Sequence, residues 1–357
     1  MVRSLPETEV AQPVVRLAII GCGAVTELCH LPAARLAREV EIVALADKNI
    51  ARAKFLGERF GIGYCTEDYH RLPENIDGVI VALPNYVHAP VALEFLNRGI
   101  HVLVEKPMAL NVGEAEAMVK TADAKGVALQ VGLMSRFCNG ARLMKRAIDE
   151  GWLGALQSFS LESGLVYDWP VASGFILSRE QAGGGELLDI GSHMLDLLLW
   201  WLGNAVDVEY RDDSLGGVEA DCWLSLVLQG PTGPVQGTVA LSRLRKLGDI
   251  ARIFGERFTI EYDLSTPATV HIWPSIWDGK DLSFVSDFGP LSCQSWNDVY
   301  AEQLRAFARA IAAGGESVVS GESVLGSIAL IERCYRDRLP LELPWTRVIG
   351  SPRRESV

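Results

Sequence analysis

Residues 14–23 read Val-Val-Arg-Leu-Ala-Ile-Ile-Gly-Cys-Gly, a short apolar run that ends in two glycines. An apolar run of this length, bounded by glycine, is typical of a buried strand in a parallel sheet. The residues that follow predict a helix over Ala24–Arg38, although Pro32 indicates a break or kink within it. We therefore expect this part of the chain to form a strand, a glycine turn and a helix.

The same alternation of strand and helix continues to about residue 135. Apolar runs predict strands at Glu41–Ala46, Gly78–Leu83, Ile100–Val104 and Val127–Val131. Between them, helix patterns cover Ile50–Phe60, Ala89–Arg98 and Val112–Lys125. Such alternation is typical of an α/β domain, in which helices cover both faces of a parallel sheet. The expected domain spans residues 14–135.

After Arg136 the pattern changes. Helices are predicted at Ala141–Glu150, Gly183–Trp201, Trp296–Ala313 and Ser323–Arg338. Strands separated by glycine turns are predicted at Ala155–Gly164, Val206–Tyr210, Ala220–Leu228, Val235–Arg243, Ile250–Phe254 and Phe258–Tyr262. Closely spaced strands of this kind indicate antiparallel hairpins, and we assign residues 136–343 to a second domain.

Composition limits the kinds of partner. The net charge of -12 argues against a protein that binds nucleic acid through its phosphates, although a local basic pocket for a cofactor is compatible with it. Seven scattered cysteines without a Cys-x-x-Cys pair argue against disulfides and structural zinc, and favour a reducing cytoplasm. The longest apolar runs, such as Leu197–Leu202, are too short to cross a membrane.

The segment Gly21-Cys22-Gly23-Ala24-Val25-Thr26 predicts a dinucleotide site. Gly21 permits a tight turn, and Gly23 lets the backbone approach a pyrophosphate at the N-terminus of the helix that begins near Ala24 and Val25. The third glycine of the full fingerprint is replaced by Thr26. Asp47, at the end of the second strand, lies where an acid binds the ribose hydroxyls of NAD.

The preference between NAD and NADP stays open at this stage. The charge of Asp47 disfavours the 2′-phosphate of NADP, but Lys48 follows it directly. The alternative for Asp47 is a helix cap or a turn residue.

Two further strand ends carry polar residues. Leu83, Asn85 and His88 follow one strand, and Glu105-Lys106-Pro107 follows the next. Open α/β sheets bind ligands at the carboxyl ends of their strands. Lys106, held before a proline, is placed to polarise a substrate oxygen. Its alternative is a surface lysine paired with Glu105.

The segment from Gly183 to Asp196 combines three glycines with a polar helix face. Asp189, His193 and Asp196 lie four and three residues apart, so a helix places them along one face. A carboxylate and an imidazole on an anchored helix suit acid–base chemistry. A face that simply meets solvent explains the spacing equally well, and a metal site is disfavoured because no further His or Cys cluster completes it.

Taken together, these motifs resemble the Gfo/Idh/MocA oxidoreductases. Besides the glycine turn, the resemblance includes the segments Leu83–His88, Glu105–Pro107, Val131–Phe137, Gly183–Asp196 and the helix Tyr300–Ala313. It runs from about Val14 to Leu343. It implies a Rossmann domain, followed by an α/β domain whose open, mostly antiparallel sheet often forms the oligomer interface.

The resemblance also implies an activity: hydride transfer between NAD, or alternatively NADP, and a hydroxyl-bearing carbon of a sugar or cyclitol. Lys106, Asp189 and His193 would form the catalytic group, with His193 as the general base. Asn85 and His88 would touch the cofactor near the nicotinamide. The resemblance further implies a homodimer or homotetramer that assembles through the C-terminal sheet.

Some roles follow less directly. Asp196 is expected to tie its helix to a neighbour. Arg136 is expected to face substrate or cofactor, and Tyr167, Asp168 and Trp169 lie in a loop-like stretch that either contacts substrate or packs on the protein. Two other functions remain open: an enzyme that retains NAD and oxidises its substrate transiently, and a cofactor sensor without turnover.

Overall fold

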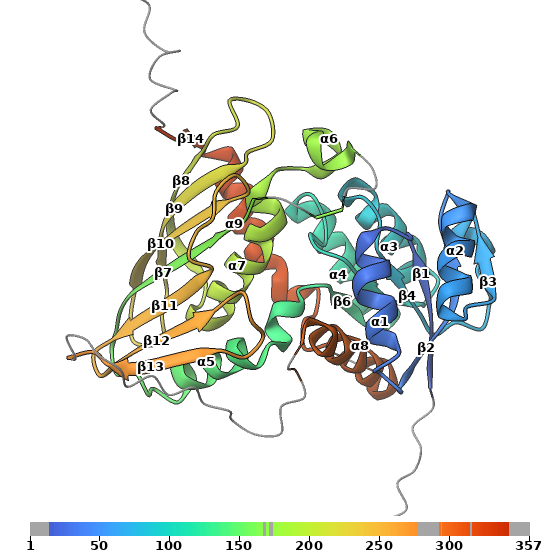
Figure 1. Cartoon of the computed structure of the whole chain (residues 1–357), viewed down its shortest axis with the longest axis horizontal. Helices are drawn as coiled ribbons and strands as arrows, with labels where there is room; N and C mark the ends of the chain where they lie inside the picture. The colour runs from blue at the N-terminus through green and yellow to red at the C-terminus, as the bar shows by residue number, and fades with distance from the viewer. Residues whose placement is uncertain are drawn as a thin grey trace, which may run out of the picture.

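The computed structural model describes residues 14–166, 169–170, 174–276, 293, 295–314 and 316–342. These residues build two sheets, one of six strands and one of eight, each packed against helices (Figure 1). The two sheets lie at opposite ends of the molecule, with helices between them. The fold class expected from the sequence is thereby confirmed.

The first sheet is parallel throughout and has the strand order β3-β2-β1-β4-β5-β6. This is the order of a Rossmann dinucleotide-binding sheet. Its strands are β1 (Val15–Ile20), β2 (Val40–Ala46), β3 (Tyr64–Thr66), β4 (Gly78–Val81), β5 (His101–Val104) and β6 (Leu129–Val131). The short edge strand β3 has no counterpart in the sequence prediction.

Both faces of this sheet are buried, and alternate residues of β1 belong to the hydrophobic clusters on the two faces. Ala18 and Ile20 pack with α3 (His88–Asn97) and α4 (Val112–Lys125). Leu17 and Ile19 pack on the other face. The helices of that face are α1 (Leu31–Ala34), α2 (Ile50–Phe60) and α8 (Trp296–Ala313).

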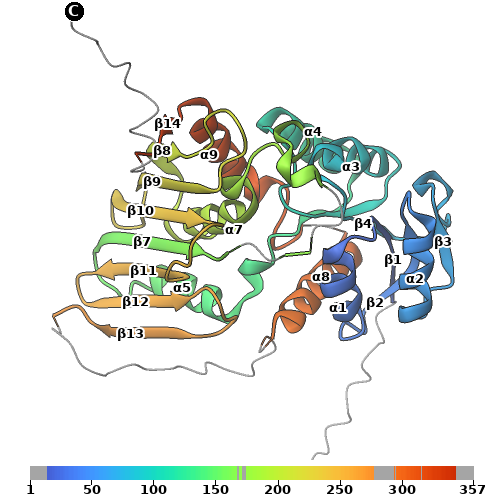
Figure 2. The same ribbon diagram turned by 45° about the horizontal axis from the view of Figure 1, so that its top comes forward.

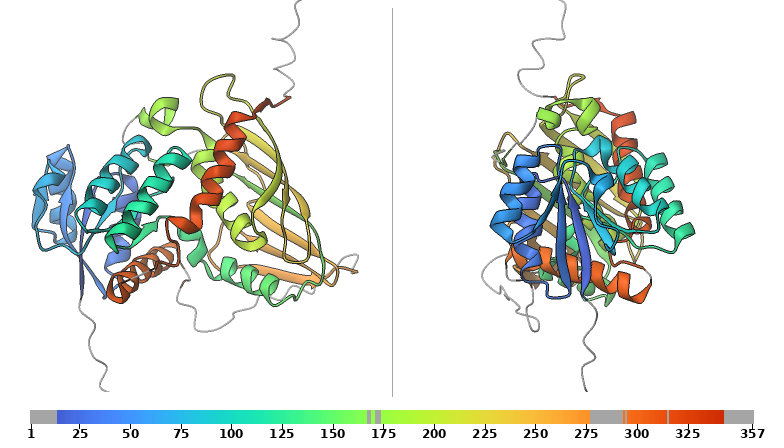
Figure 3. Two further views of the ribbon diagram at one scale, coloured as in Figure 1. Left: turned by 180° about the vertical axis from the view of Figure 1, so that it is seen from behind. Right: turned by 90° about the vertical axis from the view of Figure 1, so that its right-hand side faces the viewer.

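Helix α8 is the unexpected member of this layer. Its ends agree with the sequence prediction, which assigned it to the second domain. In the structure Leu304 and Phe307 pack beneath the first sheet with Leu17 and Ile80. The chain therefore returns to the Rossmann domain before it ends, and Figure 3 shows α8 beside that domain from two sides.

The second sheet has the order β13-β12-β11-β7-β10-β9-β8-β14 (Figure 2). Its strands are β7 (Leu156–Gly164), β8 (Ala205–Asp212), β9 (Asp221–Leu228), β10 (Val235–Ser242), β11 (Ile250–Gly255), β12 (Phe258–Asp263), β13 (Val270–Pro274) and β14 (Leu339–Pro340). Most neighbours are antiparallel, but β10 pairs with β7 and β14 pairs with β8 in parallel. Parallel pairing of β7 with β10 requires a long connection, which contains α7.

Among the described residues, the α-helices of this half are α5 (Asn139–Asp149), α6 (Arg179–Ala182), α7 (Glu186–Leu202) and α9 (Leu325–Arg336). Helices α5, α7 and α9 lie on the face of the second sheet that is turned toward the Rossmann domain (Figures 1 and 3). Trp201 and Leu197 of α7 are buried there. This packing holds α7 against its sheet while its first turns face the other domain.

The described residues include no helix that is long and apolar enough to cross a membrane. All seven cysteines are free thiols. Six of them are buried, and burial raises the pKa of Cys22 to about 12. These thiols pack as small apolar groups.

Candidate active site

The polar residues singled out in the sequence gather where the carboxyl ends of the Rossmann strands meet the first turns of α7. Lys106 follows β5, and its Nζ donates to the carboxylate of Asp189 and, at 3.0 Å, to the carbonyl oxygen of the same residue. Lys106 and Asp189 are 83 residues apart in the chain. The contact therefore joins the two domains at one site.

The glycine turn has the backbone that a dinucleotide site needs. Gly21 has a φ of +102°, and a Cβ there would lie 2.1 Å from the carbonyl oxygen of Ala82, so only glycine fits. A Cβ on Gly23 would meet nothing within 4 Å. The open space beside Gly23, Ala24 and Val25 lies at the N-terminus of a helical segment, where an anionic pyrophosphate is favoured.

Thr26 explains why the third glycine is dispensable. Its hydroxyl donates to the carbonyl oxygen of Gly21 at 2.6 Å, and its side chain is fully buried. The first turn, which begins as a π-helix at Thr26–His30, is thus tied back to the glycine loop. Pro32 lies in the first turn of α1, where a proline needs no backbone donor.

Asp47 holds the same loop from the end of β2. One carboxylate oxygen accepts from the backbone N–H of Cys22 at 2.7 Å, and the other accepts from that of Asn49 at 2.8 Å. Asp47 is therefore both a turn residue and a carboxylate beside the glycine loop. Lys48 is exposed. Arg52, which the sequence interpretation missed, donates from Nε to the carbonyl oxygen of Cys22 at 3.0 Å and pairs with Glu27.

Asn85 and His88 lie on the loop after β4. The Asn85 amide donates to the carbonyl oxygen of Ala182 in α6 at 2.8 Å, which links the two domains. The two ring nitrogens of His88 lie 2.7 Å from the carbonyl oxygens of Pro107 and Leu83. His88 is 1% exposed. The structure thus makes it a link between two loops, and its contact with the cofactor stays a prediction.

Glu105 is a buried anchor directly before Lys106. Its carboxylate lies 2.8 Å from His30 Nε2 and accepts from the backbone N–H of Lys106 at 3.2 Å. Burial alone would raise the pKa of Glu105, but the imidazole of His30 holds it below its usual value. Because Glu105 bonds His30, Lys106 is left to pair with Asp189. The surface pair of Lys106 with Glu105, weighed from the sequence, does not form.

His193 lies one turn beyond Asp189 on α7 and is 8% exposed. Its Nδ1 is 3.5 Å from the hydroxyl of Ser135. Within the described part of the chain, its Nε2 has no hydrogen-bond partner. Burial, with Lys106 nearby, lowers the pKa of His193 to about 3. The imidazole is therefore neutral at physiological pH and able to accept a proton.

The helix that carries Asp189 and His193 begins at Glu186, three residues later than the sequence predicted. A Cβ on Gly184 would lie 2.0 Å from the Tyr335 hydroxyl, and one on Gly185 would lie 1.9 Å from the carbonyl oxygen of Glu219. Glu219 accepts from the backbone N–H groups of Gly185 and Leu187 at 2.9 and 3.1 Å. The glycines permit this close approach, and Glu219 caps the helix.

Arg136 forms a buried ion pair with Asp196. Its Nε and Nη2 donate to the two carboxylate oxygens of Asp196 at 2.7 and 2.6 Å, and its Nη1 and Nη2 also donate to Ser323. Arg136 is 5% exposed and Asp196 is 1% exposed. The buried pair ties α7 to the segment after β6, as expected for Asp196. The guanidinium thus has protein partners on two sides, and its contact with substrate or cofactor stays a prediction.

Two aromatic candidates remain open. Tyr167 and Asp168 lie outside the described residues. Trp169 is described and is 44% exposed. Substrate contact by this stretch therefore stays a prediction.

The described residues contain no group of three or more His, Cys, Asp and Glu side chains that could hold a metal ion. Asp196 turns to Arg136, whereas Asp189 turns to Lys106. Asp189 and Asp196 consequently belong to separate ion pairs, and the neutral His193 belongs to neither.

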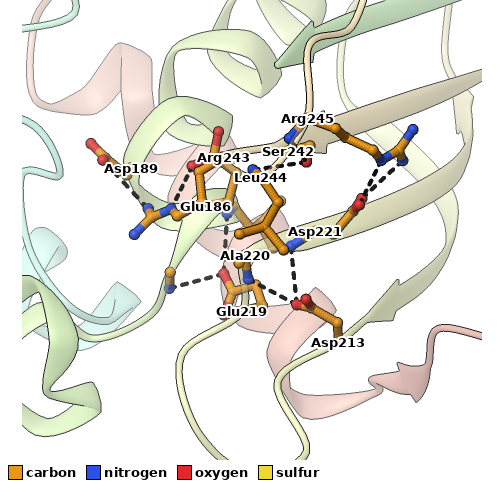
Figure 4. Close-up of polar contacts among 12 residues, drawn as sticks. Glu186, Asp189, Asp213, Glu219, Ala220, Asp221, Ser242, Arg243, Leu244 and Arg245 are labelled. Carbon is orange, nitrogen blue, oxygen red and sulfur yellow. Dashed lines mark hydrogen bonds and ion pairs between the residues drawn. The ribbon is translucent and has the colours of Figure 1, made fainter. Parts of the chain in front are cut away.

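Two functional candidates, Arg243 and Glu186, were missed from the sequence. Arg243 follows β10; its Nε donates to Glu186 at 2.9 Å, and its Nη2 lies 3.5 Å from Asp189 (Figure 4). Arg243 lies more than 50 residues along the chain from the helix carboxylates that it contacts, so no local pattern in the sequence indicates the pairing. For Glu186, its position three residues before Asp189 is a usable hint, because the two share a helix face.

This fold and this glycine turn define a Rossmann dinucleotide-binding protein with a second α/β domain at the edge of its site. Residues 15–133 match the model of an oxidoreductase family with an NAD-binding Rossmann fold, and residues 114–261 match the GFO/IDH/MocA C-terminal domain. The chain belongs to the GFO/IDH/MocA oxidoreductase family. The resemblance noted in the sequence is thus confirmed.

Individual relatives agree with this assignment. The D-glucoside 3-dehydrogenase of Escherichia coli is 32% identical over 194 residues, 53% of this chain and 54% of that protein. The inositol 2-dehydrogenase of Rhizobium meliloti is 25% identical over 330 residues, 90% of this chain and 96% of that protein. The match thus spans about half the length of the first relative and nearly all of the second.

A solved structure shows the same fold over most of the chain. The aldose-aldose oxidoreductase from Caulobacter crescentus, complexed with glycerol, superposes with a TM-score of 0.80 at 24% identity. The match covers 91% of this chain and 97% of that one.

Proposed function

We propose that this chain is an NAD(P)-dependent oxidoreductase. It would transfer a hydride between the nicotinamide ring and the carbon of a secondary hydroxyl in a sugar, cyclitol or sugar derivative. The contact of Lys106 with Asp189 carries the proposal, because it places a cation and a carboxylate from two domains at the edge where Rossmann sheets bind ligands. The names of the sugar and inositol dehydrogenases among the relatives support the substrate class.

The residues of the site fit this reaction. The cofactor, when bound, supplies the hydride acceptor or donor. Neutral His193 accepts the proton of the substrate hydroxyl, while the ammonium of Lys106 stabilises the negative charge that develops on the same oxygen. Asp189 orients Lys106, and Glu105, fixed by His30, orients the backbone at Lys106.

We expect NAD to be preferred over NADP. The Asp47 carboxylate stands beside the glycine loop, and its charge would repel a 2′-phosphate. The guanidinium of Arg52 is engaged by Glu27 and by the backbone of Cys22, so it is not directed at a phosphate.

The proposal is tested by reduction of NAD and NADP with a panel of inositols, hexoses, uronic acids and amino sugars. Turnover of a panel member, with a higher kcat/KM for NAD, is the expected result. The cofactor content of the purified protein is measured in parallel, because retained NAD would indicate the transient-oxidation alternative. If neither cofactor binds and no compound reacts, the proposal is wrong.

Replacing His193 by glutamine is expected to lower kcat about 100-fold, because a general base contributes roughly that much or more. With a pKa of about 3, His193 stays neutral at higher pH, so its protonation should cause no loss of rate between about pH 5 and 8. The measurement is the pH dependence of kcat for both forms. His70→Gln, at an exposed histidine, is the matched control. An unchanged rate in His193→Gln would exclude His193 as the base.

We also propose that the chain assembles as a homodimer or homotetramer through the outer face of the second sheet. No described helix lies on that face in Figures 1 and 3. Trp223, Val227 and Phe254 are only partly buried there. Light scattering of the purified protein should give the mass of two or four chains, and the mass of one chain would contradict this.

We infer a reducing compartment, the cytoplasm, as the place of action. The seven free thiols support it, since oxidising compartments favour disulfides. Cell fractionation followed by detection of the protein tests this inference.

A further inference from the structure

The guanidinium of Arg243 links the end of β10 to the first turn of α7. The backbone N–H of Arg243 donates to the carbonyl oxygen of Ala220 at 2.9 Å, which fixes where its side chain begins. Its Nε then donates to Glu186 at 2.9 Å and its Nη2 reaches Asp189 at 3.5 Å (Figure 4). One arginine thus bridges two carboxylates that share a face of α7.

These contacts continue the ion pair of the candidate site. Lys106 contacts one carboxylate oxygen of Asp189, and Arg243 approaches the other. The order of charges is therefore Lys106, Asp189, Arg243 and Glu186, with alternating sign. The Glu186 and Arg243 side chains are 3% and 12% exposed, so solvent screens their interaction little.

The helix backbone at this point is held independently of Arg243. Glu186 donates its backbone N–H to the carbonyl oxygen of Glu219 at 3.0 Å, and the Glu219 side chain caps Gly185 and Leu187. Loss of the Arg243 guanidinium would leave these bonds in place. What would change is the charge around Asp189.

From this geometry we propose that Arg243 is a positioning residue of the reaction. It keeps the Asp189 carboxylate ionised and directed at Lys106, and Glu186 sets how much of the Arg243 charge reaches Asp189. The proposal rests on the function proposed above. Arg243 acts through Asp189 and Lys106, and no contact of its own with substrate is required.

The electrostatics support this arrangement. Partial loss of water raises the pKa of Asp189, yet Lys106 first and Arg243 next lower it by more, so the net pKa lies below its usual value. Burial raises the pKa of Glu186 to about 7, although Arg243 opposes the rise.

Other described groups also act on the carboxylates of Glu186 and Asp189. His193 acts on Asp189 from the same helix, and Lys106 acts on both Glu186 and Asp189 from the end of β5. As the pH falls below about 7, Glu186 becomes protonated and leaves more of the Arg243 charge for Asp189. Asp189 should then remain ionised to lower pH than it would without Arg243.

The experiment compares Arg243→Gln, Arg243→Lys and Glu186→Gln with a matched control, Arg245→Gln. Arg245 is also bonded to a carboxylate, Asp221, at 2.7 Å, but lies away from Asp189 in Figure 4. kcat and KM are measured from pH 4 to 10. The titration of the Asp189 carboxyl is followed by ¹³C NMR on aspartate-labelled protein without substrate, assigned by loss of the signal in Asp189→Asn.

Arg243→Gln is expected to lower kcat about 10- to 100-fold with a smaller change in KM. It is also expected to raise the midpoint of the Asp189 titration by about one pH unit, because a neighbouring opposite charge is lost. Arg243→Lys should restore part of both. In Glu186→Gln, the change in kcat near pH 7 should disappear, whereas the fall in kcat at acidic pH should persist. Arg245→Gln should resemble the unmodified protein.

The double variant Glu186→Gln with Arg243→Gln guards against misfolding, because it leaves no buried charge without its partner. In this double variant, the midpoint of the Asp189 titration should still be raised. If the titration and the pH profile of Arg243→Gln match those of Arg245→Gln, the proposal is wrong. If the unmodified protein turns over no substrate, the proposed function fails, while the NMR titration still decides the role of Arg243.

Discussion

Replacing Lys106 by methionine is expected to lower kcat about 1,000-fold, the largest effect of any single substitution in this chain. Lys106 is the cation that reaches the site from the Rossmann domain, and its Nζ is already held by Asp189 in the right place. Preorganised donors aimed at a developing oxyanion account for about 100- to 1,000-fold in rate each. Methionine keeps the length of the side chain but removes the charge and the donors. Steady-state kinetics with the substrate found in the panel measures the loss.

A control separates this effect from a general loss of positive charge. Lys120 is exposed on α4, and Lys120→Met should leave kcat unchanged. Cofactor binding, followed by the fluorescence of NADH, should persist in Lys106→Met. A fall in kcat of less than 10-fold would mean that Lys106 does not stabilise the reacting oxygen.

Replacing Asp196 by alanine is expected to destabilise the protein by about 3–5 kcal/mol, the cost of removing one partner of a buried ion pair. Both oxygens of Asp196 accept from Arg136, and the alanine would leave that guanidinium buried without its counter-charge. The pair joins α7 to the segment after β6, so its loss weakens the attachment of α7 to that segment. Denaturant unfolding followed by circular dichroism gives the free energy of unfolding.

The double variant Arg136→Met with Asp196→Leu tests the cause. Removing both charges together should recover much of the lost stability, because apolar residues often replace a buried ion pair without large cost. If Asp196→Ala alone costs less than about 1 kcal/mol, the pair does not contribute as its burial suggests.

Much of the dinucleotide site could be predicted from the sequence because its parts are local. β1, the turn at Gly21 and the helical segment after it occupy adjacent residues, and their hydrophobic period and glycines record the structure directly. Asp47 was found by its distance along the chain from the glycine loop. The resemblance to an oxidoreductase family then ordered the remaining motifs and singled out Lys106, Asp189 and His193.

Other features depend on contacts between residues far apart in the chain, so no local pattern in the sequence indicates them. The ends of α8 were predicted correctly, yet its packing beneath the first sheet depends on Leu17 and Ile80, far away in the chain. The pairing of Arg136 with Asp196, 60 residues further along the chain, follows only from the fold. The two backbone carbonyl groups that lie beside the ring of His88 likewise have no signal in the sequence.

By itself, then, the sequence determined the order of the elements, the glycine turn and the family of the protein, because each depends on residues close together in the chain or on motifs in fixed order. The tertiary structure decided which charges face each other. Lys106 pairs with Asp189 rather than with Glu105, because the carboxylate of Glu105 is bonded to His30. Arg243 lies near Asp189 because β10 ends beside α7. Electrostatic partners are set by distance in space, which a linear pattern does not contain.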